Sequence, residues 1–90
     1  MDDFKEHLKK QLENPTFAAE WKRQEPEREY IRAIVGARIE QNMTQEELSI
    51  KTGIRQSNIS RIENGYCSPT VATLQQIAAG MGKTLYIEFR

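Results

Sequence analysis

Hydrogen-bonding side chains gather near the middle of the chain, where their types and spacing suit the recognition of base edges. These side chains are Arg55, Gln56, Ser57, Asn58 and Arg61. A glutamine amide matches the donor and acceptor of adenine in the major groove, and an arginine fork matches guanine. Lys51, a little earlier, is suited to backbone phosphates, which fix register without reading sequence. Together they predict a surface that binds double-stranded DNA.

Two short helices joined by a tight turn must hold these side chains. Thr44 and Glu47 have the spacing of a capping box, which predicts that the first helix begins at Thr44. Gly53 supplies the positive φ that a sharp turn between helices needs. Ile59 and Ile62 share one face of the second helix, so the polar residues fall mostly on the other. We expect this helix to end at Asn64-Gly65.

The stretch TQEELSIKTGIRQSNISRIENG resembles the helix-turn-helix of the Xre and phage Cro/repressor family. The resemblance implies that Gln45 clamps a phosphate, that Gln56 and Ser57 read base edges, and that Asn58 and Arg61 reach bases or backbone. Arg55 departs from the family, which usually has a capping Ser or Thr there. Because Arg is a poor cap, we interpret it as a residue that gives up helix stability for contact with guanine or phosphate.

The rest of this domain is expected to be helical. A helix from Pro26 to Asn42 would turn Tyr30, Ile31, Ile34 and Val35 toward the core, with Ile39 as a further candidate. Ser68 and Pro69 resemble an N-cap and first helical residue, which predicts a last helix over 69–79. The predicted fold class is all-α: a five-helix domain like that of lambda repressor over 26–90, with an N-terminal helical arm over 1–25.

The C-terminal tail changes its hydrophobic period from that of a helix to strict alternation. This pattern predicts a half-buried strand with no second strand in the chain to pair with. The expected remedy is antiparallel pairing with a second copy, giving a homodimer with recognition helices roughly 34 Å apart on a palindromic operator. The predicted dimerisation residues are Leu85, Tyr86, Ile87, Glu88 and Phe89.

The N-terminal arm carries an apolar stripe and two large aromatics. Its expected protein-binding residues are Phe4, Leu8, Leu12, Phe17 and Trp21, with a break at Asn14-Pro15. Arm, helix-turn-helix and tail together resemble HigA-type antitoxins. That resemblance implies that the arm neutralises a RelE/HigB-like toxin that cleaves mRNA, while the domain represses the operon encoding both. The alternative is a stand-alone Xre-family transcriptional repressor without a toxin partner.

Composition limits the other function classes. Formal charge is zero, which slightly favours an adaptor that uses the fold for protein contact, but residues 30–90 hold five acids and seven bases. One His, a lone Cys67 and no glycine-rich phosphate loop leave no basis for an enzyme, a metal or a cofactor. Without a long apolar run or a secretory N-terminus, we expect a cytoplasmic protein with no membrane contact.

Overall fold

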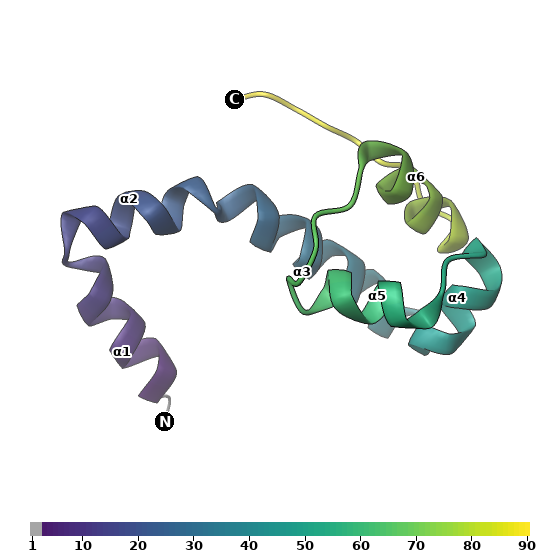
Figure 1. The fold of residues 1–90 in the computed structure, drawn as a ribbon, viewed down its shortest axis with the longest axis horizontal. Coiled ribbons are helices and arrows are strands. Elements are labelled where there is room, and N and C mark those ends of the chain that lie inside the picture. The colour runs from purple at the N-terminus through teal and green to yellow at the C-terminus, as the bar shows by residue number, and fades with distance from the viewer. Residues whose placement is uncertain (1–2) are drawn as a thin grey trace.

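The computed structural model describes the backbone of residues 3–90 and the side chains of residues 5–90. This part of the chain forms six helices: α1 (Asp3–Leu12), α2 (Pro15–Arg23), α3 (Glu25–Glu40), α4 (Gln45–Thr52), α5 (Gln56–Glu63) and α6 (Val71–Gly80). Helices α3–α6 form a body, and α1 and α2 form an arm that extends from the start of α3 (Figure 1). Within residues 3–90 no helix has the length and apolarity needed to cross a bilayer.

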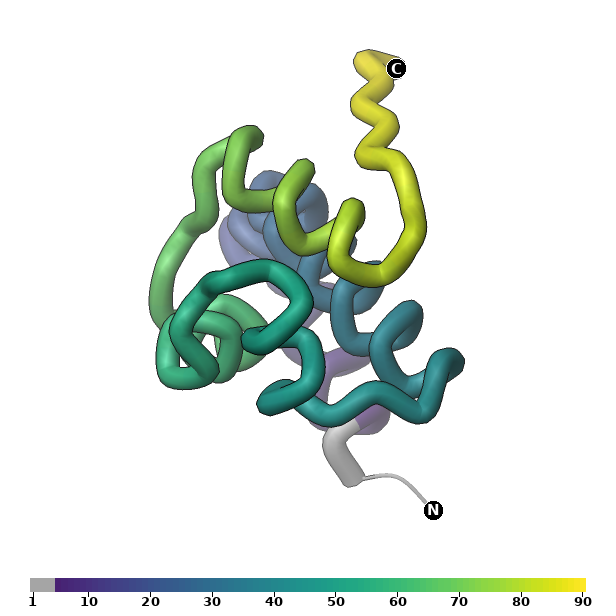
Figure 2. Tube along the Cα trace, turned by 90° about the vertical axis from the view of Figure 1, so that its right-hand side faces the viewer, coloured from purple at the N-terminus to yellow at the C-terminus, as the bar shows by residue number. Residues whose placement is uncertain are grey.

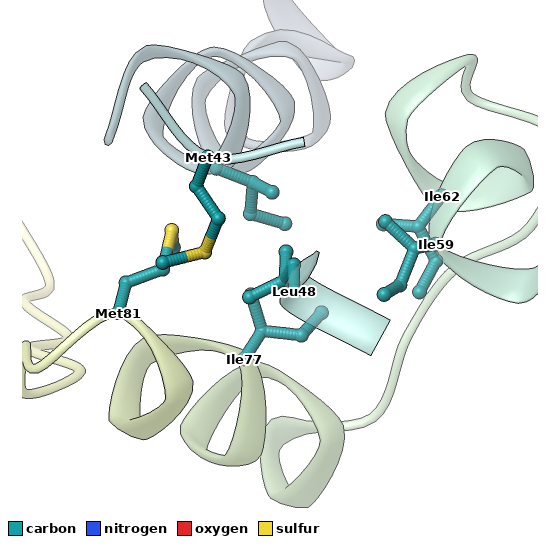
Figure 3. Close-up of a cluster of buried hydrophobic side chains, with 7 residues drawn as sticks. Met43, Leu48, Ile59, Ile62, Ile77 and Met81 are labelled. Carbon is teal, nitrogen blue, oxygen red and sulfur yellow. The ribbon is translucent and has the colours of Figure 1, made fainter. Parts of the chain in front are cut away.

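One hydrophobic core unites the four helices of the body. Leu48 on α4, Ile59 on α5 and Ile77 on α6 are its most completely buried large side chains. Figure 3 shows these three converging with the other labelled core residues. The full cluster consists of Ile34, Met43, Leu48, Ile59, Ile62, Ile77 and Met81. Because α3, α4, α5 and α6 all contribute side chains to this cluster, the core fixes the position of α5 against the rest of the body.

The arm is held by local contacts instead of a core. The Asn14 side chain caps α2 by accepting from the backbone N–H of Thr16 at 2.9 Å. The rings of Phe17 and Trp21 stack at 6.1 Å, and the Arg28 guanidinium on α3 lies 3.5 Å from the centre of the Trp21 ring. Among residues 5–24 no side chain is buried. The break at Asn14-Pro15 is confirmed, and the division at residue 25 stays a prediction.

The predicted C-terminal strand is wrong. Beyond Gly82 the chain has no regular secondary structure, and the tail leaves the body as an extended segment, in yellow in Figure 2. Tyr86 and Phe89 are 79% and 99% exposed, Ile87 and Glu88 are also exposed, and only Leu85 is half-buried. The reason is that residues 3–90 offer no second strand, so backbone donors and acceptors have no ladder to join. Homodimerisation itself stays a prediction.

Smaller predictions need correction too. The body contains four helices, one fewer than expected from the resemblance. The last helix begins at Val71, since Thr70 and not Ser68 is its N-cap, accepting from the backbone N–H of Thr73 at 3.1 Å. Ile39 is 60% exposed and lies outside the core, whereas Ala37 is partly buried against it. The helix α3 ends at Glu40 with Gln41 as its C-cap, and Asn42 follows in the left-handed region with φ of 53°.

Candidate nucleic-acid interface

The turn between α4 and α5 has the predicted construction. The backbone N–H of Glu47 donates to the Thr44 hydroxyl at 3.0 Å, and the backbone N–H of Thr44 donates to the Glu47 carboxylate at 2.9 Å. The pKa of Glu47 is lowered, first by the hydrogen bond from the Thr44 backbone N–H and then by one with the Thr44 side chain, because both favour the charged carboxylate. Gly53 ends α4 with φ of 77°, a conformation in which a Cβ is strained. The capping box and the corner glycine are both confirmed.

Side-chain hydrogen bonds hold the turn between α4 and α5 and connect it to α6. The Thr52 hydroxyl, in a buried residue, donates to the backbone carbonyl of Leu48 at 2.8 Å, and the Ser49 hydroxyl donates to the carbonyl of Ile54. From α6, the Gln76 amide donates to the carbonyl of Thr52 at 2.6 Å. Of these three carbonyls, that of Thr52 belongs to the last turn of α4 and has no partner within the helix, so the bond from Gln76 satisfies it. The start of α5 is therefore fixed in direction relative to α4 and α6.

Helix α5 divides sharply into a buried and an exposed side. Ile59 and Ile62 are 0% and 3% exposed, and they face the core. All five predicted recognition residues are exposed: Arg55, Gln56, Ser57, Asn58 and Arg61. Arg55 occupies the N-cap position without a side-chain cap hydrogen bond, as expected for a residue that caps poorly. The exposed side of α5 thus presents donors and acceptors to solvent.

The Gln45 side chain forms a hydrogen bond with a member of an ion pair that the sequence did not predict. Arg38 on α3 donates from Nε and Nη2 to the two oxygens of Glu63 at 2.8 and 2.9 Å, and from Nη1 to the carbonyl of Met43 at 3.0 Å. The Gln45 amide nitrogen donates to the same carboxylate at 2.9 Å. The two charged partners lie 25 positions apart, so no local spacing indicates that they meet.

A shallow cleft of about 550 Å³ runs beside α5. Arg55, Asn58 and Arg61 line it from α5, and Thr73 and Gln76 line it from α6. Cys67 in the intervening loop also lines the cleft, half-buried, and its backbone carbonyl accepts from the Tyr30 hydroxyl at 3.4 Å. The cleft places polar groups of a second helix next to the exposed side of α5.

The remaining predicted site residues belong to neither α5 nor the lining of this cleft. Lys51 is exposed in the last turn of α4. On the arm, Leu8, Phe17 and Trp21 are half-buried and Leu12 is 37% exposed, whereas the side chain of Phe4 lies outside the described residues. The described part of the chain brings together no group of His, Cys, Asp and Glu side chains that could hold a metal ion.

Comparison with known proteins agrees with this geometry. Residues 36–87 match the helix-turn-helix family, a range that contains the capping box, the corner glycine and all of α5. An uncharacterised HTH-type transcriptional regulator of Haemophilus influenzae is 35% identical over 57 residues, covering 63% of this chain and 58% of that protein. Another, of Sinorhizobium fredii, is 37% identical over 57 residues, covering 58% of this chain and 74% of that protein. No solved structure matches significantly. The chain belongs to the helix-turn-helix family.

Proposed function

We propose that this protein is a transcriptional regulator that binds double-stranded DNA by placing α5 in the major groove. The observation that carries the proposal is the division of α5, whose apolar side is buried in the core while five polar residues face solvent. An exposed helix with this set of donors and acceptors fits the width of the major groove and can distinguish base pairs there. The similar proteins of Haemophilus influenzae and Sinorhizobium fredii carry names of transcriptional regulators.

The proposed DNA-binding residues divide into those that contact phosphates and those that contact bases. Gln45 and Lys51, in the first and last turns of α4, would hold phosphates, which fix register without reading bases. Gln56 and Ser57 begin α5, where side chains of a recognition helix reach base edges. Arg55, Asn58 and Arg61 face the cleft beside α5, so they are placed for bases or for the adjoining backbone.

Replacing Gln56 with Ala tests the reading role. Its loss should cost about 1–3 kcal/mol on a duplex that the wild-type chain selects from a random pool, and should relax preference at one position. Gln75, exposed on α6, gives the matched control, and Gln75→Ala should bind like wild type. Equal weakening of Gln56→Ala on selected and scrambled duplexes would show that Gln56 grips only the backbone.

We also propose that the arm binds a protein partner, and that this partner is a RelE/HigB-like toxin neutralised by the arm. What supports it is the arm's construction: helices α1 and α2 stand off the body and bury no residue among 5–24. Phe17 and Trp21 nevertheless form a stacked pair, and large aromatics are favoured as interface anchors. A regulator without any toxin is the competing proposal, and it gives the arm no partner.

Changing Phe17 and Trp21 together to Ala tests the arm. A chain that uses them as central anchors should lose several kcal/mol of affinity for the toxin, measured by calorimetry with the toxin encoded beside its gene. Phe89→Ala removes a fully exposed aromatic elsewhere and should leave affinity unchanged. If no small toxin copurifies with the chain from its host, or if the double variant still neutralises the toxin, the antitoxin proposal fails while DNA binding stands.

A further inference from the structure

The carboxylate of Glu63 lies where the last turn of α5 meets the beginning of α4. Its side chain is only 6% exposed, and its two oxygens accept three hydrogen bonds, two from Arg38 and one from Gln45. Arg38 is itself 15% exposed and bridges α3 to the Met43 carbonyl just before α4. One buried carboxylate therefore connects three helices and holds the side chain of Gln45.

We propose that Glu63 is a positioning residue for DNA binding, which orients the Gln45 amide so that its nitrogen meets a backbone phosphate. The proposal rests on the function proposed above and assigns a role to a residue that does not itself touch DNA. Gln45 is the first residue of α4, next to the capping box, and it is half-buried, so part of it stays open to solvent.

The Gln45 amide has two different ends, a carbonyl oxygen that accepts hydrogen bonds and an NH₂ group that donates them. An ionised carboxylate only accepts hydrogen bonds, so it selects the orientation in which Gln45 turns its NH₂ group toward Glu63. That nitrogen carries two hydrogens, and one remains after the bond to Glu63 is made. A phosphate oxygen likewise only accepts, so the remaining N–H is the group that can bind it. The carboxylate thereby turns a two-sided amide into a donor.

The ion pair also decides whether the negative charge of Glu63 disturbs a nearby phosphate. A carboxylate close to a phosphate would repel it, but the bidentate bond from Arg38 offsets the charge of Glu63. Glu63 can therefore stand behind Gln45 without repelling the DNA backbone. This arrangement makes two opposite predictions for Glu63→Gln. The substitution makes the net charge more positive, which by itself would tighten DNA binding. Loss of the Gln45 orientation would weaken DNA binding, because a glutamine at position 63 can present either end of its amide to Gln45.

The test is a double-mutant cycle of Gln45→Ala and Glu63→Gln in the full-length chain. Affinities are measured by fluorescence anisotropy on a duplex selected from a random pool by the wild-type chain. In the wild-type background we expect Glu63→Gln to weaken binding three- to tenfold, about the value of one hydrogen bond. In the Gln45→Ala background no amide remains to be oriented, so the same change should leave binding unchanged or tighter. A merely structural role of Glu63 would instead weaken binding equally in both backgrounds.

Two controls complete the design. Glu46→Gln removes an equal charge from an exposed side chain in the first turn of α4 and should not weaken binding. If Glu63→Gln is unfolded by circular dichroism, Glu63→Asp keeps the charge but shortens the side chain by one methylene, and it should weaken binding only when Gln45 is present. In ethylation interference experiments, both Gln45→Ala and the Glu63 variant should lose the contact with one phosphate.

The outcomes separate the two proposals. If Glu63→Gln binds as well as wild type or better, or weakens binding equally in both backgrounds, Glu63 does not position Gln45, and the proposed function is untouched. If the wild-type chain selects no duplex and binds none at low salt, the proposed function itself fails.

Discussion

The body and the arm are both helical, but they are held together by different physics. In the body, Leu48 and Ile59 are fully buried, and seven residues from four helices and their loops share one core. In the arm no side chain among residues 5–24 is buried, and its attachment to α3 centres on the stack of Arg28 over Trp21. A surface on the body is therefore preorganised, whereas the arm belongs to the regions that open at low free-energy cost.

This difference matters for what each region can bind. Base recognition needs donors held within a narrow range of geometry, and the core supplies that by fixing α5. A protein-binding arm gains from apolar surface that is not already buried in its own fold, and Phe17 and Trp21 retain such surface. Variants that damage one region and spare the other test this contrast.

The largest effect is expected from Leu48→Ala. The side chain is 0% exposed at the centre of the core, so its truncation should cost about 2–5 kcal/mol of unfolding free energy. Leu12→Ala makes the same chemical change in the arm at a site 37% exposed, and should cost about 0.5 kcal/mol or less. Urea denaturation measures both. Similar losses for the two variants would show that the arm is as tightly packed as the body.

A smaller effect comes from the crossing of α4 and α6. A Cβ at Gly80 would lie 2.4 Å from Cγ2 of Thr52 and 3.4 Å from Cδ1 of Leu48, so Gly80→Ala forces the two helices apart. We expect a cost of about 1–3 kcal/mol, typical of overpacking. Gly36→Ala, where nothing lies within 4 Å, should instead stabilise α3 by about 0.5–1 kcal/mol. Thermal unfolding that moves both variants in the same direction would contradict the close crossing.

The sequence predicted the local construction of the motif well, because its signals are short-range. Thr44 with Glu47 marks a helix start, Gly53 marks the corner, and the period of Ile59 and Ile62 separates the two sides of α5. Each signal arises from backbone chemistry within a few residues and needs no knowledge of tertiary packing.

What the sequence could not predict depends on distant partners. The pair of Arg38 and Glu63 forms only when α3 and α5 are packed, so Gln45 could be assigned to phosphate but not to the carboxylate that holds it. In the tail, a local pattern indicated a strand that the structure does not contain. Its alternation of Leu85, Ile87 and Phe89 has the period of a strand, but period alone supplies no neighbouring strand, and the segment stays extended.

A still smaller effect should follow from removing Trp21. Trp21→Ala deletes the stack with Arg28, an interaction of about 0.5–2 kcal/mol, and loosens α2 from α3. Hydrogen exchange should speed up in residues 15–23, while the amides of α4 and α5 keep their protection. Lys22→Ala, an exposed neighbour on the same helix, is the control and should change neither. Faster exchange throughout the body would mean that the arm supports the core.

The smallest effect concerns pH, and it separates the caps of the two regions. The α4 cap contains Glu47, whose pKa is lowered below its ordinary 4.5 by hydrogen bonds with Thr44, whereas the α2 cap uses the neutral amide of Asn14. A pKa lowered by folding means stabilisation that is present above the unfolded value and lost as pH falls through the folded one. Glu47→Gln keeps an acceptor but does not titrate. Wild type should therefore melt slightly above Glu47→Gln at about pH 6, and the gap should close as pH falls through the lowered pKa of Glu47. A constant gap across that range would mean that the Glu47 charge contributes nothing to the cap. The helicity of α2, measured through labelled backbone carbonyls, should not differ between wild type and Glu47→Gln at either end of this pH range, since the α2 cap carries no titrating group.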